Sequence, residues 1–137
     1  MEKKDIALKQ LRSAAKLYKS RDYISTITLA GAAEEILGQI AKKRTKTNEM
    51  EKEAKYSKNI YSYFAQPIPP DKVIVAQINK IKNELKHNDS GENSWIESDF
   101  ENEANLLFVR AVKNYFNAYN EMPKDKIITS LFDYLTL

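Results

Sequence analysis

The 137-residue sequence contains no cysteine, and this absence excludes several kinds of site at once. A disulfide framework, a thiol nucleophile and any zinc site with cysteine ligands all need residues that the chain lacks. The chain also has only one histidine, so a histidine-rich metal cluster is excluded too. We therefore expect no metal and no cofactor.

Glycine and proline are scarce, with three and four residues respectively. Few turn residues and few alternating β-branched segments leave little material for strands. The sequence thus predicts an all-α fold. Its length matches one domain with a single core, so we expect one helical domain over residues 1–137.

Long apolar runs are missing as well. The most apolar region, residues 23–41, is interrupted by polar and acidic side chains, which indicates a buried core helix and not a membrane span. Residues 1–5 are charged and have no apolar signal-peptide core behind them. We expect a cytoplasmic protein with no membrane role.

The chain lacks a strong excess of one charge, because 22 basic and 19 acidic residues leave a net charge of +3. This balance is too even to indicate a nucleic-acid-binding protein by itself. Short basic stretches at residues 42–46 and 80–86 add some affinity for phosphate. The first of them also suits the C-terminal end of a helix, where cations are stabilised by the helix dipole.

Helical periodicity is what the sequence does have. It predicts a central core helix over residues 22–43 and, with it, an up-and-down four-helix bundle with additional short helices. Ser98 and Glu101 form a capping-box pattern that predicts the start of one long helix. The predicted helices cover residues 3–19, 22–43, 48–64, 71–87, 99–119 and 127–135.

The predicted helix over residues 71–87 has two different faces. On a helical wheel, its isoleucines and Leu85 form a narrow stripe that faces the core. The opposite face begins with Val75 and Ala76 and continues with the polar side chains of Asn79, Asn83, Lys86 and His87. Two interpretations remain open at this point: a second packed surface, such as a dimer seam, or a solvated helix end.

Residues 82–87, Lys-Asn-Glu-Leu-Lys-His, resemble the Arg-Asn-x-x-x-His signature of the HEPN superfamily of all-α domains. The spacing and the asparagine agree, and Lys82 replaces the signature arginine. The resemblance extends over residues 3–119, including the segment Leu-Ala-Gly-Ala-Ala-Glu-Glu-Ile-Leu at 29–37 and Arg110 in the following long helix. It implies a HEPN-like fold and a homodimer.

Many HEPN domains are metal-independent ribonucleases in toxin–antitoxin or defence systems. The resemblance therefore implies RNA as a substrate and an antitoxin or nucleotidyltransferase as a partner. Imidazole, with an ordinary pKa of about 6.5, suits proton transfer at the ribose hydroxyl. On this hypothesis His87 is the general acid or base, Lys82 stabilises the phosphate and Asn83 orients it. Asn79 and Lys86 are supporting residues.

Lysine keeps the charge of the missing arginine but lacks its planar two-pronged grip on phosphate oxygens. The substitution weakens or abolishes the implied activity, so a non-catalytic helical module that binds a protein or a nucleotide is the alternative. Lys82 and His87 also point about 140° apart on one helix. They converge only if the helix ends near Lys86 or if two subunits contribute.

The central helix carries Gly31, Glu35 and Gly38 on one face. A glycine inside a helix costs about 1 kcal/mol relative to alanine, so we expect another group to approach closely there. A structural ion pair between a glutamate of this helix and Arg110 is the favoured interpretation, because buried charges are usually paired. Glu35 as a site carboxylate beside the motif is the alternative.

Overall fold

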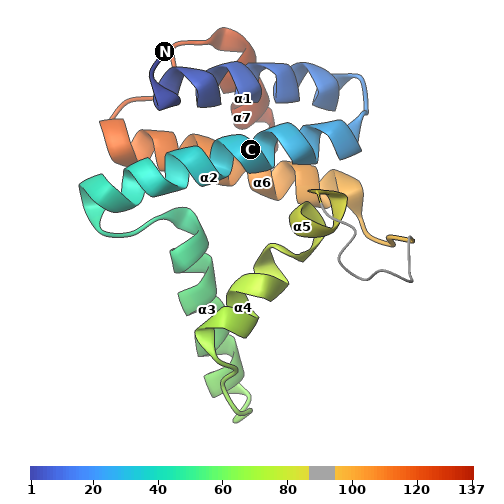
Figure 1. Cartoon of the computed structure of the whole chain (residues 1–137), viewed down its shortest axis with the longest axis vertical. Helices are drawn as coiled ribbons and strands as arrows, with labels where there is room; N and C mark the ends of the chain where they lie inside the picture. The colour runs from blue at the N-terminus through green and yellow to red at the C-terminus, as the bar shows by residue number, and fades with distance from the viewer. Residues whose placement is uncertain (87–94) are drawn as a thin grey trace.

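The computed structural model describes residues 1–86 and 95–137, which form seven α-helices and no strand (Figure 1). The prediction of an all-α fold is confirmed for these residues. His87 lies outside them. None of the described helices has both the length and the apolar character that a membrane crossing requires. The helices are α1 (Lys3–Lys19), α2 (Tyr23–Thr45), α3 (Glu49–Tyr63), α4 (Asp71–Ile78), α5 (Lys80–Lys86), α6 (Phe100–Tyr119) and α7 (Lys126–Leu135).

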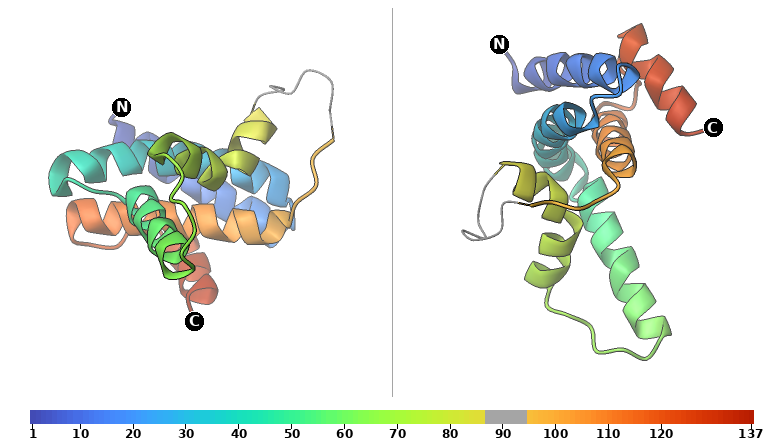
Figure 2. Two further views of the ribbon diagram at one scale, coloured as in Figure 1. Left: turned by 90° about the horizontal axis from the view of Figure 1, so that it is seen from below. Right: turned by 90° about the vertical axis from the view of Figure 1, so that its right-hand side faces the viewer.

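The core lies between α1, α2 and α6, which run side by side (Figures 1 and 2). Leu11, Ile27, Leu37, Phe108 and Val112 are fully buried there, together with several alanines that let the helices approach closely. Helix α7 covers this layer with Ile128 and Leu131. The predicted central helix at residues 22–43 is thus confirmed as the middle element of the core.

Short polar side chains fix the helix starts. The side chains of Asp22, Asn48 and Asp125 accept backbone N–H groups from the first turns of α2, α3 and α7. At α6 the capping residue is Asp99, whose carboxylate accepts the N–H of Asn102 at 3.0 Å. The predicted capping box on Ser98 is therefore wrong by one residue, since a carboxylate at the next position can cap and also interacts favourably with the helix dipole.

The single helix predicted over residues 71–87 is divided at Asn79 into α4 and α5. The hydrogen-bond ladder continues through the break, because Asn79 N–H donates to the Val75 carbonyl at 3.1 Å and Asn83 N–H donates to the Asn79 carbonyl at 2.9 Å. Asparagine favours local deviations from helical geometry. The break turns α5 relative to α4, and Lys82 becomes buried on the side of α2.

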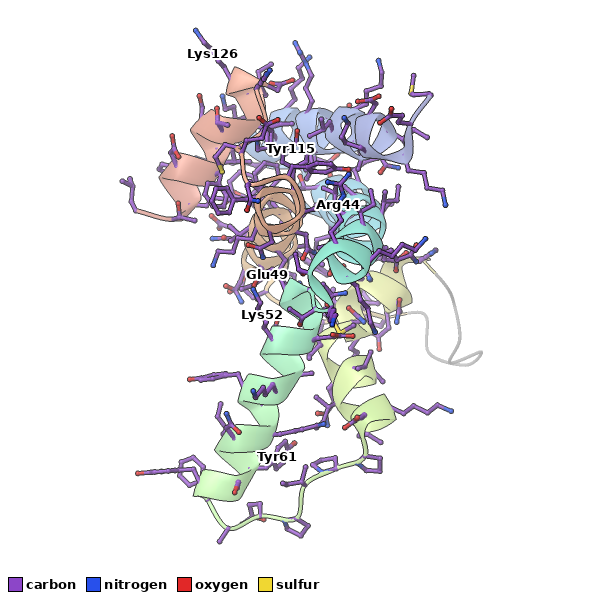
Figure 3. The ribbon with its side chains drawn as sticks, turned by 90° about the vertical axis from the view of Figure 1, so that its left-hand side faces the viewer. Arg44, Glu49, Lys52, Tyr61, Tyr115 and Lys126 are labelled. Atoms are coloured by element: carbon purple, nitrogen blue, oxygen red, sulfur yellow. The ribbon has the colours of Figure 1, made fainter. Side chains whose placement is uncertain are left out.

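Helices α1, α2, α6 and α7 pack together, and we call them the bundle. Helices α3 and α4 project from it as a hairpin, whose far ends are joined by the proline-containing segment 64–70 (Figure 2). Figure 3 shows Glu49 and Lys52 where α3 leaves the bundle, and Tyr61 near its far end. No residue of α3 is fully buried. The hairpin therefore contributes little to the core.

Candidate functional site

Lys82 is buried although it carries a charge, with only 8% of its surface exposed. Its Nζ lies 2.8 Å from Oε1 of Glu35 and 3.5 Å from Oε2 of Glu34, both on α2. A buried ammonium group is tolerated only when carboxylates compensate for its lost hydration. Here two neighbouring glutamates on one helix supply that compensation.

Gly31 makes room for the Lys82 side chain. A Cβ atom at position 31 would lie 2.6 Å from Cδ and 2.8 Å from Cγ of Lys82, which is closer than real contacts allow. The predicted close approach at this glycine is therefore confirmed, and the approaching group is a lysine from α5. At Gly38 the neighbours are Asn48 and Asn114, and Asn48 Nδ2 donates to the Gly38 carbonyl at 3.2 Å.

Arg110 of α6 is the second buried cation. Its Nε lies 3.7 Å from Oε1 of Glu34, and its Nη1 donates to Oε2 of Glu53 at 2.8 Å. The predicted ion pair between a central-helix glutamate and Arg110 is confirmed with Glu34. The role of Glu53 was not predicted, because the strongly charged start of α3 gives no sign of which glutamate turns inward.

These five residues form one continuous arrangement, which we call the charge network: Glu35, Lys82, Glu34, Arg110 and Glu53. It joins α5, α2, α6 and α3 through alternating charges. The network therefore anchors both ends of the projecting hairpin region to the bundle.

Two pKa shifts accompany this arrangement. Burial raises the pKa of Glu35, but the hydrogen bond and charge of Lys82, together with Lys86, bring it below its ordinary value. The pKa of Glu103, on α6, is raised by burial and by the nearby Glu53, despite the opposing charge of Arg110. Glu35 is therefore held ionised by its lysine partner.

The other residues predicted for the motif are not members of the charge network, although the charge of Lys86 acts on Glu35. Asn83 and Lys86 are exposed on α5, and Asn79 is half-buried at the break. The Asn79 Oδ1 atom is buried and has no hydrogen-bond partner among the described residues. The structure thus brings together Lys82, Glu35 and, through Glu34, Arg110. The catalytic roles assigned to His87, Lys82 and Asn83 stay predictions.

In the part of the chain that the structure describes, no three His, Asp or Glu side chains gather in a way that could hold a metal ion. Glu34 and Glu35 instead meet the ammonium group of Lys82.

The exposure of several large apolar side chains on the hairpin was not predicted from the sequence. Six large apolar side chains there are between 42% and 84% exposed. The cluster of aromatic residues at the end of α3 was the only signal for it. We call these residues the hairpin surface: Tyr56, Ile60, Tyr63, Phe64, Ile68 and Val73.

Comparisons with protein-family models, curated proteins and solved structures give no match to this chain. The charge network and the hairpin surface are therefore the features of this protein from which a function can be inferred.

Proposed function

We propose that this chain is a non-catalytic helical interaction module that works as a homodimer joined through its hairpin surface. The observation that supports this proposal is the exposure of the six apolar side chains on one projecting element. Single exposed apolar residues are ordinary, but a gathered apolar patch marks an interaction site.

The stability of the hairpin gives a second reason. Isolated helices of about 15 residues are marginal in water, and most helices in proteins are stabilised by burying an apolar face. Helix α3 has 15 residues and buries none of them fully. A partner against the hairpin surface would supply the missing burial.

Charge favours a second copy of the chain as that partner. Residues 49–73 contain four acidic and four basic side chains, so two hairpins do not repel each other. Near the tip, Lys58 pairs with Asp71 of its own hairpin. A two-fold interface brings the same patch from both subunits together, which suits a neutral apolar surface. The hairpin has no net charge that would attract an RNA or a strongly charged protein.

The position of Lys82 supports a non-catalytic role. Its ammonium group already contacts two carboxylates, and turning it toward a phosphate would break buried pairs. Separating such a pair costs about 3–5 kcal/mol. The negative charge of Glu35 beside it would also repel a phosphate.

We expect the double substitution of Tyr63 and Phe64 by glutamate to weaken dimerisation at least tenfold, because aromatic anchors carry much of the energy of an interface. Both side chains are largely exposed, so the subunit fold should be retained. Sedimentation velocity across a concentration series would measure the change. Ile24→Glu, at an exposed position at the start of α2, is the matched control and should leave the dimer intact. A monomeric unmodified protein at about 100 μM would contradict the proposal.

A ribonuclease with the HEPN-like four-helix bundle is the second candidate function. One observation favours it: Asn83 and Lys86 are both exposed on α5, directly before His87 in the chain. For this candidate function, the implied substrate is RNA and the implied partner is an antitoxin or a nucleotidyltransferase.

Incubation with mixed RNA in EDTA separates the two candidates. We expect no cleavage between pH 5 and 9, since Lys82 is held by Glu34 and Glu35. Cleavage that disappears in the His87→Ala variant and persists in Lys80→Ala would overturn the non-catalytic assignment. Cleavage of RNA would not decide whether the hairpin surface joins two subunits, because dimerisation is measured separately.

A further inference from the structure

A concave site lies where the end of α1 and the start of α2 meet the start of α6 and the middle of α7. Its volume is about 750 Å³, within the range of sites that bind small molecules. Neither the charge network nor the hairpin surface contributes to it. We call it the tyrosine pocket, after Tyr18, Tyr23 and Tyr134 in its lining.

The three tyrosines give this pocket an aromatic wall. The rings of Tyr18 and Tyr23 meet edge to face, with centroids 5.2 Å apart and planes inclined at 63°. Tyr18 is almost fully buried, whereas Tyr134 is 68% exposed and stands at the rim. Aromatic walls of this kind bind planar rings by offset stacking or edge-to-face contact.

Two cations, Lys19 and Arg21, line the same pocket. Both are exposed, and neither forms an ion pair with a described residue. This contrasts with the charge network, in which each cation has a carboxylate partner. Glu101 is the one carboxylate in the described lining, so the pocket has a net positive charge. The pocket therefore combines aromatic faces with cations that are available to an anion.

The backbone at Arg21 also departs from what its residue type favours. Arg21 has a φ of 62°, in the left-handed region, and ends α1 by donating its N–H to the Tyr18 carbonyl at 3.0 Å. Asp22 N–H donates to the Leu17 carbonyl at 2.9 Å. Glycine is the residue usually found at this position of a helix end. The chain instead places a guanidinium group at the edge of the pocket.

We propose that the tyrosine pocket binds a small aromatic anion, with its planar ring against the tyrosines and its phosphate group on Arg21 and Lys19. Arginine suits this role because its fork binds phosphate oxygens in pairs. A nucleotide and a simple aryl phosphate share this chemistry. The Glu101 carboxylate favours the nucleotide, because a nucleobase offers N–H groups that a carboxylate can accept. The proposal does not depend on dimerisation through the hairpin.

Isothermal titration calorimetry of the full chain with four probes tests this chemistry: adenosine 5′-monophosphate, phenyl phosphate, adenosine and inorganic phosphate. We expect the first two to bind at least tenfold more tightly than the last two. Tighter binding of the nucleotide than of phenyl phosphate would identify a nucleobase site, and equal affinities would identify an aryl phosphate site. The proposal is overturned if no probe binds at millimolar concentrations, or if inorganic phosphate binds as tightly as the nucleotide.

The variant Arg21→Gly separates binding from folding. Glycine relieves the left-handed backbone, so the thermal midpoint should be unchanged or higher, while the affinity for the nucleotide falls at least tenfold. Tyr134→Ala should weaken binding as well without affecting the fold, because this side chain is largely exposed. Lys16→Ala, an exposed cation on α1 outside the pocket, is the matched control. Unchanged affinity in both Arg21→Gly and Tyr134→Ala would contradict the proposal.

Discussion

Replacement of Lys82 by alanine is expected to destabilise the protein by about 3 kcal/mol, because it removes one partner of a buried ion-pair network. Glu34, which is only 4% exposed, would lose one of its two cationic partners and retain Arg110, whose Nε lies 3.7 Å from Oε1 of Glu34. Glu35 would lose its contact at 2.8 Å but remains partly solvated, which keeps the loss at the lower end of the range for buried pairs. Urea denaturation followed by circular dichroism measures the change.

Two further variants separate the lysine's charge from its packing. Lys80→Ala removes an exposed lysine from the same helix and should change the free energy of unfolding by less than about 0.5 kcal/mol. Lys82→Met retains most of the apolar stem and should fall between Lys82→Ala and the unmodified protein. A Lys82→Ala variant as stable as Lys80→Ala would show that the network contributes nothing to stability.

The effect of Lys82 should also depend on pH. The pKa of folded Glu35 lies below its ordinary value of 4.5, which applies in the unfolded chain. The contribution of the pair is therefore fully present above that value and is lost as the pH falls through the folded pKa. We expect the stability difference between the unmodified protein and Lys82→Ala to be constant at neutral pH and to shrink below about pH 4.5.

The long helices and their core were predictable because helical periodicity repeats many times within one element. The start of α1 at Lys3 and the end of α6 at Tyr119 agree with the sequence-based limits. The core positions of Leu11 and Leu37 follow from the same pattern. A local signal that is repeated over several turns tolerates an error at any single residue.

The burial of Lys82 was not predictable in the same way. Ile81 and Leu85 pack against the core as the helical wheel predicts, and Lys82 lies at the edge of their stripe. A lysine at such an edge is ordinarily solvated, and the wheel of one helix does not show that two glutamates of another helix compensate for its burial. The glycine at position 31 indicated that something must approach α2 closely, but spacing along α2 cannot identify a partner from another helix. The projection of α3 and α4 is equally a matter of packing between elements, which periodicity within each helix does not specify.

Replacement of Gly31 by alanine should destabilise the protein by about 2 kcal/mol, although alanine is the better helix former by about 1 kcal/mol. The added Cβ would lie 2.6 Å from Cδ of Lys82, so the lysine must move away from its two carboxylates. Gly38→Ala is the matched control on the same helix. Its Cβ would meet Asn114 Nδ2 at 3.4 Å, close to an ordinary contact, and the change should be neutral or slightly stabilising.

The double variant tests whether the cost of Gly31→Ala comes from Lys82. Once Lys82 is alanine, no side chain stem occupies the space beside position 31, and the next neighbour, Leu107 Cδ1, lies 3.9 Å from the added Cβ. Gly31→Ala should then stabilise the helix by up to about 1 kcal/mol, so its effect changes sign between the two backgrounds. Urea denaturation of all four proteins in the cycle gives the coupling free energy. If Gly31→Ala lowers the free energy of unfolding equally in both backgrounds, the effect of the substitution does not come from the Lys82 stem. The packing of α5 against α2 would then not depend on that stem.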